Sequence, residues 1–338
     1  MQNPDSKTGE LPLKRIVLVG DHLQNSPVVQ NFALRDYANL EQSLFLRLIR
    51  LGVPHIMLDA QGRCRDSITK LFSWRYPGLQ NLPHVASLPE FRRANAGFKH
   101  EYQFINVDDY QGQGEREPSP HFIQNLGEAE YAVALFQYMC LLGYPAKSIT
   151  ILAAYAGQRA LIRDVLEHRC KGNKLFGLPK AVTTIDKYQG EQNDYIILSL
   201  TRTKTVGFMR DVRRLTVALS RARRGLYIIG RRALFSELPG LDIACQKGSA
   251  EGRLEIVTAE LYPAQRDVND ENVQSTEIHG VEHLGQYVYE MTQAKVKQLG
   301  GNVSLLRNGA GGEDQLDADG LEEEAEIDGE VDPLHEQV

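Results

Sequence analysis

The chain has 338 residues, of which 42% are hydrophobic and 24% charged, and its formal net charge at pH 7 is −6. Residues 309–338 hold twelve acidic and no basic residues, so the remainder carries 38 basic against 32 acidic side chains and is compatible with a polyanionic partner. No apolar run reaches about 18 residues and the segment MQNPDSKTGE lacks an apolar core, which excludes a transmembrane helix, a secretory leader and a membrane partner and predicts a soluble globular protein.

Apolar runs alternate with segments of helical periodicity through the first 235 residues. In chain order, the pattern predicts a strand over 14–20, a helix over 41–52, a strand over 55–60, a helix over 127–143, a strand over 148–155, a helix over 157–170, strands over 181–186 and 195–200, a helix over 211–224 and a strand over 225–230. Short apolar strands separated by helices are typical of a parallel sheet covered on both faces. The predicted fold class is therefore α/β, with a doubly wound parallel sheet.

Two regions show weaker periodicity. Residues 76–125 are rich in Pro, Gly and polar residues, and we expect this irregular segment to carry function or to connect domains. After residue 238 the sequence predicts one strand over 253–262 and one helix over 283–299. The acidic tail, 301–338, has too few apolar residues to offset the conformational entropy that ordering would cost, so we expect it to be disordered.

Gln24 follows the first predicted strand at the turn Gly20-Asp21. A residue in that place lies at the carboxyl edge of a parallel sheet, where α/β proteins bind ligands. From there a carboxamide can hold a γ-phosphate oxygen or orient the attacking water. The alternative is a turn glutamine that only faces water.

Two later segments suit an anionic ligand. Gln189 and Gly190 are predicted at a strand-to-helix turn, where the glycine lets the backbone approach a phosphate. From Arg202 to Arg232 there are ten Lys or Arg and one acid. On the helix predicted over 211–224, Arg214 and Arg221 lie along one exposed stripe, either as ligand contacts or as a solvated basic face.

Four segments, LVGDHLQNSP, LDAQGRCR, VTTIDKYQGEQNDYIILSLTR and LTVALSRARRGLYIIG, resemble in order the later motifs of superfamily 1 RNA helicases of the nonsense-mediated-decay group. Further stretches, among them EQSLFLRLIRLGVP and QNLGEAEYAVALFQYMCLLGYP, resemble the spliceosomal, intron-binding branch of that group, over roughly residues 13–300. The resemblance implies a RecA-like P-loop NTPase fold. It assigns 1–70 to the end of the first RecA-like domain, 71–238 to the second, 239–300 to a C-terminal extension and 301–338 to the disordered tail.

The resemblance also implies roles for individual residues. Gln24 matches the γ-phosphate sensor, Arg63 a γ-phosphate arginine and Arg221 the arginine finger, and guanidinium groups suit that task because they stay charged. The implied nucleotide contacts are Gln61, Gln189, Gly190, Glu191 and Gln192. The implied RNA contacts are Tyr155, Gln158 and Thr184, for which core packing or a strand-edge position is the alternative.

The sequence departs from the family pattern at several of these places. Asn25 and Ser26 follow Gln24 where relatives have Leu-Pro, and Gly62 stands where most relatives have a tyrosine that stacks on adenine. Ala153 replaces a threonine, and Gln192 replaces a ribose-binding glutamate. If ATP binds beside Gly62, we expect weak selectivity for the base.

Part of an ATPase site is not found in this sequence. It contains no Gly-Lys pair, hence no P-loop, and no D-E-A-x segment to hold Mg²⁺. The cofactor implied is ATP with Mg²⁺, whose ligands this chain does not encode.

The four cysteines, Cys64, Cys140, Cys170 and Cys245, form no C-x-x-C pair, so we expect reduced thiols and no metal site. The first strand would lack sheet neighbours, and we expect residues 1–58 to be poorly ordered or aggregation-prone when expressed alone.

The function that these features favour is that of a C-terminal part of an ATP-dependent RNA helicase acting on pre-mRNA introns in the spliceosome. The expected partners are single-stranded RNA and spliceosomal proteins, and the expected location is the nucleus. Alone, the chain is expected to bind ATP weakly and to hydrolyse none. The alternatives are a non-enzymatic RNA- or protein-docking module that retains the RecA-like fold, and a DNA helicase or helicase-nuclease of the same superfamily.

Overall fold

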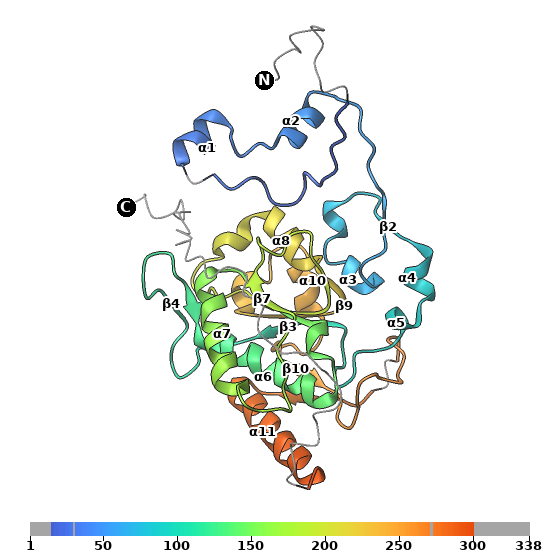
Figure 1. Ribbon diagram of the computed structural model, residues 1–338, viewed down its shortest axis with the longest axis vertical. Coiled ribbons are helices and arrows are strands. Elements are labelled where there is room, and N and C mark those ends of the chain that lie inside the picture. The colour runs from blue at the N-terminus through green and yellow to red at the C-terminus, as the bar shows by residue number, and fades with distance from the viewer. Residues whose placement is uncertain (1–14, 30, 271–272, 301–338) are drawn as a thin grey trace, which may run out of the picture. The chain divides into compact units, whose positions relative to one another are not determined.

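A computed structural model describes residues 15–29, 31–270 and 273–300, so the predicted acidic tail lies outside the described residues. The chain divides into two compact units, Met1–Met57 and Leu58–Val338, and this boundary precedes residue 70. Figure 1 shows the elements of each unit.

The first unit contains two short helices, α1 (Phe32–Ala38) and α2 (Leu44–Arg50). The side chain of Ser43 caps α2 by accepting a hydrogen bond from the Leu46 amide, which confirms the centre of the helix predicted over 41–52. The strand predicted over 14–20 is wrong for its described part, because residues 15–20 form no strand and Val19 is 93% exposed. An apolar strand of this kind requires neighbours in a sheet, and the described part of this unit provides none.

A five-stranded parallel sheet forms the centre of the second unit. Its strands lie in the spatial order β3 (Tyr102–Asn106), β9 (Ala222–Gly230), β8 (Asn193–Ser199), β6 (Ile149–Ala153) and β7 (Ala181–Thr184). The register places Ile197 opposite Ile151 on one side and opposite Tyr227 on the other. This sheet confirms the predicted α/β class and is consistent with a RecA-like fold.

Alternate side chains of each strand enter two separate cores, one on each face of the sheet. On β8, Tyr195 and Ile197 join one core, whereas Ile196 and Leu198 join the other. The first core is covered by α6 (Leu126–Leu142), α7 (Ala156–Cys170) and α11 (Val281–Gln298). The second is covered by α3 (Asp66–Thr69), α8 (Val212–Leu219), α9 (Arg232–Phe235) and α10 (Leu241–Gln246). In Figure 1 α8 lies above the strands, and α6 and α11 lie below them.

The segment expected to be irregular supplies the edge strand β3. Gln103 and Asn106 interrupt its apolar run, which hid the strand from a reading of apolar periodicity. Gln103 is nevertheless buried, because its amide donates to the Arg253 carbonyl at 2.5 Å and accepts from the Glu255 amide at 3.3 Å. A polar side chain is tolerated inside a sheet when its hydrogen bonds are satisfied in this way.

Shorter elements complete the described ranges. They are β1 (Ala60–Gln61), β2 (Gln80–Asn81), α4 (Pro83–Ser87), α5 (Pro89–Arg92), β4 (Glu115–Arg116), β5 (Gln124–Asn125), β10 (Leu254–Ile256) and β11 (Thr276–Ile278), with 3₁₀ turns at Ser73–Arg75, Ala146–Ser148 and Gly207–Arg210. The strand predicted over 55–60 is reduced to β1, which pairs with β2 in parallel. β10 pairs with β11, and residues of both strands and of α11 join the first core.

The described residues contain neither a membrane-spanning helix nor a metal-binding cluster. No helix among them is long and apolar enough to cross a membrane. Nor do three or more His, Cys, Asp or Glu side chains gather in those ranges to hold a metal ion. The four cysteines are free thiols, and Cys64, Cys170 and Cys245 are buried.

Gly240 packs between the Leu71 carbonyl, which follows α3, and the Leu219 side chain of the second core. Its φ is +82°, and a Cβ at this position would overlap the carbonyl oxygen of Leu71. We therefore expect Gly240→Ala to lower the free energy of unfolding by about 2 kcal/mol, since both the backbone strain and the overlap must be relieved. Urea denaturation of the variant measures this effect. Gly172→Ala, at a glycine of similar φ (+77°) with open space around it, separates the strain from the overlap.

Candidate functional site

Arg221 lies in a turn between a helix and a central strand. Helix α8 ends at Leu219 and β9 begins at Ala222, so the helix predicted over 211–224 is too long and Arg221 does not share an exposed stripe with Arg214. The side chain of Arg221 is 1% exposed. Its Nε donates to the Val217 carbonyl at 3.0 Å, and its terminal nitrogens donate to Ser220 Oγ at 2.6 Å and to the Glu191 carbonyl at 3.4 Å.

Arg63 reaches the same place from a distant part of the chain. Its Nε donates to Gln192 Oε1 at 2.6 Å, and one terminal nitrogen donates to the Ser220 carbonyl at 3.1 Å. Because Asn193 pairs with Ala222 where β8 and β9 begin, this cluster lies at the amino-terminal ends of two central strands. The structure thus brings together Arg63, Gln192 and Arg221, which were predicted to act on one nucleotide.

Gln61 supports the loop that carries Arg63. Its Oε1 accepts from the amides of Arg63 (2.9 Å) and Cys64 (2.8 Å), and its Nε2 donates to the Cys64 carbonyl, to Thr69 Oγ1 and to Asn81 Oδ1. Both ends of the carboxamide are therefore committed within the protein. The geometry gives Gln61 a positioning role, whereas the sequence suggested direct contact with a nucleotide.

The predicted nucleotide loop is a turn that leads into β8. Residues 185–190 form the turn, and no helix follows, so the expected strand-to-helix turn is wrong. Because β7 and β8 are parallel, the chain uses this segment to return to the amino-terminal end of the sheet. Residues 189–192 are exposed, and Gly190 has a φ of +89°. They border an open hollow of about 600 Å³ lined by Lys180, Gly190, Glu191, Gln192, Asn193, Asp194 and Arg223.

All three predicted RNA contacts are buried. Gln158 is 0% exposed; its Oε1 accepts from the Asn125 amide at 2.7 Å, and its Nε2 donates to the Asn125 carbonyl and to Ser199 Oγ. Tyr155 is 3% exposed, and its hydroxyl accepts from the Phe208 amide at 3.1 Å. Packing and internal hydrogen bonds thus occupy both side chains, contrary to the expected channel-lining positions. Thr184 ends β7 at the opposite, carboxyl edge of the sheet and is 9% exposed.

Sequence reasoning missed a stack of four side chains around Tyr155. The Tyr155 and Phe208 rings are stacked with centroids 4.7 Å apart and planes 19° apart. The Arg202 guanidinium lies 5.9 Å from the Tyr155 centroid, and that of Arg214 lies 4.6 Å from the Phe208 centroid. Burial raises the pKa of Tyr155 to about 12, so the phenol stays neutral and donates or accepts hydrogen bonds only. No local pattern relates Phe208 to Tyr155, because they are far apart in the chain.

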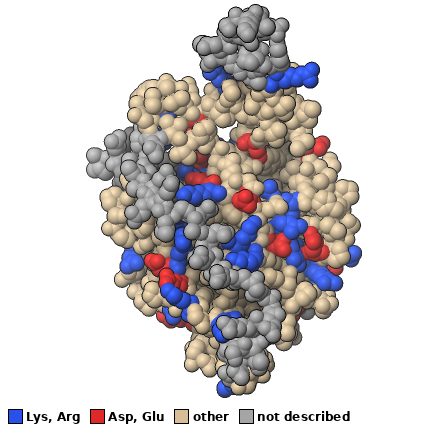
Figure 2. All heavy atoms as spheres, in the orientation of Figure 1, with Lys and Arg blue, Asp and Glu red and all other residues tan. Residues whose placement is uncertain are grey.

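Acidic residues, most of them from other segments, neutralise much of the basic segment Arg202–Arg232. At least six of its ten cations form ion pairs, which are Arg202–Glu115, Arg213–Asp211, Arg214–Asp186, Arg223–Glu90, Arg224–Asp194 and Arg231–Asp109. Figure 2 shows acidic and basic side chains side by side on the face drawn. A count along the sequence therefore overstates the charge that this segment presents to a polyanion.

Gln24 belongs to the first unit. Its Nε2 donates to Asp21 Oδ2 at 2.7 Å, and the other carboxylate oxygen of Asp21 accepts from the Leu23 amide at 2.9 Å. Ser26, one of the departures from the family pattern, donates to Glu41 Oε1 at 3.1 Å. The turn after Asp21 is thus held by side chains of its own unit, and the role of Gln24 stays a prediction.

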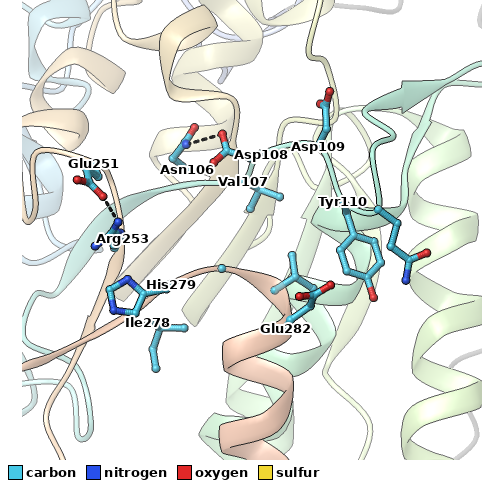
Figure 3. Close-up of a pocket in the computed structure, with 13 residues that line it drawn as sticks. Asn106, Val107, Asp108, Asp109, Tyr110, Glu251, Arg253, Ile278, His279 and Glu282 are labelled. Atoms are coloured by element: carbon cyan, nitrogen blue, oxygen red, sulfur yellow. Dashed lines mark hydrogen bonds and ion pairs between the residues drawn. The ribbon is translucent and has the colours of Figure 1, made fainter.

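A second hollow lies at the end of β3. It measures about 540 Å³ and is lined by Asn106–Gln111, Glu251, Arg253 and Ile278–Glu282. Figure 3 shows Tyr110 and Glu282 next to each other on one side and Glu251, Arg253 and His279 on the other, with Asn106 bound to Asp108 and Arg253 bound to Glu251. None of the residues predicted to bind a ligand lines it.

Comparison with known proteins gives the family context of this arrangement. Residues 40–233 match the AAA_12 family, described as an AAA domain. The chain is 52% identical to RNA helicase aquarius of Mus musculus over 293 residues, which are 86% of this chain and 20% of that protein. It is 36% identical to pre-mRNA-splicing factor cwf11 of Schizosaccharomyces pombe over 83% of this chain and 22% of that protein. It is 33% identical to ATP-dependent helicase NAM7 of Saccharomyces cerevisiae over 64% of this chain and 23% of that protein. The chain thus spans about a fifth of the length of these curated relatives.

Proposed function

We propose that this chain, which belongs to the AAA_12 family of AAA domains, is the C-terminal part of an ATP-dependent superfamily 1 RNA helicase. By likeness to RNA helicase aquarius and to splicing factor cwf11, its substrate is the pre-mRNA intron, its partners are spliceosomal proteins and its location is the nucleus. The observation that carries the proposal is the convergence of Arg63, Gln192 and Arg221, from three distant segments, on the amino-terminal ends of β8 and β9.

The donors of this cluster fit one wall of a triphosphate site. Two guanidinium groups reach the same turn. The acceptors of Arg221 include two backbone carbonyls and one hydroxyl, all of them uncharged. A phosphate oxygen is a stronger acceptor than either, because it is charged. When bound, ATP supplies the phosphoryl bond whose hydrolysis drives a helicase. Arg63 and Arg221 would then hold the charge of the terminal phosphate, and the exposed residues Gln189–Gln192 would border it.

The described residues do not fit the magnesium ion that such ATP chemistry uses. They contain no cluster of three carboxylate, His or Cys ligands, and the sequence has no Gly-Lys pair for a P-loop. We therefore assign to this chain the arginines and no metal-dependent step, and the RNA contact of Thr184, which is 9% exposed at the carboxyl edge, stays a prediction. On its own the chain is expected to bind ATP weakly and to hydrolyse none.

Arg63→Ala tests this assignment. In the full-length protein, we expect the variant to lower RNA-stimulated ATP turnover about 10- to 100-fold, which is the effect of losing one charge-assisted hydrogen bond. Arg92→Ala, which removes an equally cationic but 65% exposed side chain, should leave turnover unchanged. Equal turnover in both variants, or RNA-stimulated ATP hydrolysis by this chain alone, would contradict the proposal.

The burial of Arg221 favours a second candidate, a docking module that kept the RecA-like fold without turnover. The Gly62 and Gln192 departures point the same way. The sequence encoded upstream of Met1 separates the two candidates, because a P-loop and a D-E-A-x segment there support a motor. An open reading frame without them, together with RNA binding that ATP does not alter, would favour the docking module.

A further inference from the structure

We propose that the imidazole of His84 is the surface on which the nucleotide base stacks, because its ring fills the space of the side chain that Gly62 lacks. The inference rests on the proposed function, because it needs a nucleotide beside Arg63. It assigns to this chain a residue that selects a nucleoside triphosphate over a bare polyphosphate.

The His84 ring occupies the space that a side chain at position 62 would enter. An ideal Cβ built on Gly62 would lie 2.6 Å from His84 Cε1 and 2.8 Å from Nε2, both closer than real Cβ contacts. The same Nε2 lies 2.9 Å from the Gly62 carbonyl oxygen, at hydrogen-bond distance. The His84 ring thus fills the position that the Cβ atom of any other residue at position 62 would take.

The pairing of β1 with β2 holds His84 in that place. Gln61 lies opposite Asn81, and the Leu82 amide donates to the Gln61 carbonyl at 2.8 Å. Helix α4 begins at the next residue, Pro83, so His84 follows directly from this pairing. The Phe91 ring packs at 6.5 Å and a tilt of 42°, and the His84 ring remains half-buried. A ring fixed by a hydrogen bond and an aromatic neighbour loses little entropy when a ligand stacks on it.

The position of the ring matches the two parts of a nucleoside triphosphate. Gly62 is adjacent to Arg63, whose guanidinium reaches Gln192 and the Ser220 carbonyl. One short loop therefore presents a cation for the phosphates and, through His84, an aromatic surface for the base. Aromatic stacking tolerates every base because each has a π-face. The base selectivity should accordingly stay weak, as expected from Gly62, while the affinity for a nucleoside exceeds that for phosphate alone.

The test compares ATP with inorganic tripolyphosphate, which has no base, as ligands of the longest protein that the gene encodes. His84→Ala should weaken ATP binding about three- to tenfold, the range of one aromatic stacking contact, and leave tripolyphosphate binding unchanged. His84→Phe should retain ATP affinity because it keeps a ring. The double variant Gly62→Tyr with His84→Ala moves a ring to position 62, where φ is not left-handed, and should restore ATP affinity. His168→Ala, at an exposed histidine of α7, is the control.

Each other outcome overturns the inference. A purely structural His84 would weaken both ligands equally, and neither Phe nor the relocated tyrosine would restore the difference between them. Unchanged ATP affinity in His84→Ala rejects the base contact while leaving the Arg63 cluster intact. If the unsubstituted protein binds neither ATP nor tripolyphosphate, the proposed function fails, and the inference fails with it.

Discussion

Replacing Arg221 by alanine is expected to lower RNA-stimulated ATP turnover by about 10³-fold, the lower end of the effect of removing an arginine finger. The structure adds a second expected effect, on stability. Arg221 is 1% exposed and satisfies the Val217 carbonyl, the Ser220 hydroxyl and the Glu191 carbonyl. Alanine would remove this donor from all three groups, although the Val217 carbonyl still accepts from Ser220, at a cost of about 1–3 kcal/mol in the free energy of unfolding.

Arg221→Gln separates the two effects. The glutamine retains a hydrogen-bond donor but carries no charge, so it should recover part of the stability and none of the turnover. Turnover is measured at a temperature where urea denaturation shows each variant to be folded. A folded Arg221→Ala protein that hydrolyses ATP at the unsubstituted rate would show that the arginine is only a structural donor between α8 and β9.

The order of the central elements was predictable because continuous apolar runs report burial directly. The strands β6, β7, β8 and β9 and the helices α6 and α7 all lie within two or three residues of their predicted bounds. The end of α8 was not predictable, since Ala and Arg favour helices and the segment Ser220–Arg224 continues the helical pattern. Pairing of β9 with both β3 and β8 overrides that preference.

The candidate site was predictable as a set of residues but not as a geometry. Motif order selected Arg63, Gln192 and Arg221, yet the contacts that bring them together, Arg63 with Gln192 and Arg221 with Glu191, join positions that are 129 and 30 residues apart in the chain. The polar residues next to the motifs were harder to assign. Gln61 and Gln158 have the same carboxamide whether it faces a ligand or the interior, and only the surrounding donors and acceptors decide between the two.

Glu128 is expected to make the stability of the fold depend on pH. This carboxyl lies in the first turn of α6 and is 1% exposed. Its Oε2 accepts from Ser199 Oγ at 2.6 Å and from the Thr201 amide at 2.7 Å, and Ser199 Oγ in turn accepts from Gln158. Burial outweighs these hydrogen bonds and raises the pKa of Glu128 from 4.5 to about 8.

The direction of the effect follows from which state binds the proton more tightly. Between pH 4.5 and 8 the folded protein keeps Glu128 protonated, whereas the unfolded chain releases the proton. The contribution of Glu128 to the free energy of unfolding is therefore highest below pH 4.5 and falls as the pH rises towards 8. From pH 5 to pH 8 the loss is on the order of 4 kcal/mol.

Glu128→Gln should remove this dependence, because the amide stays neutral at every pH and its oxygen can still accept from Ser199 and Thr201. Denaturant titrations at pH 5, 6, 7 and 8 measure the free energy of unfolding of both proteins. The value for the variant should rise relative to that of the unsubstituted protein as the pH increases, and should exceed it at pH 8. Glu130→Gln, in the same helix but paired with Arg169 at 3.0 Å, is the matched control and should not show that gain. Parallel curves for Glu128→Gln and the unsubstituted protein would mean that Glu128 is ionised in the fold. In that case the hydrogen bonds from Ser199 and Thr201, together with any ordered water, would have to stabilise a buried charge, and the carboxyl edge of β8 would be a more polar environment than its burial indicates.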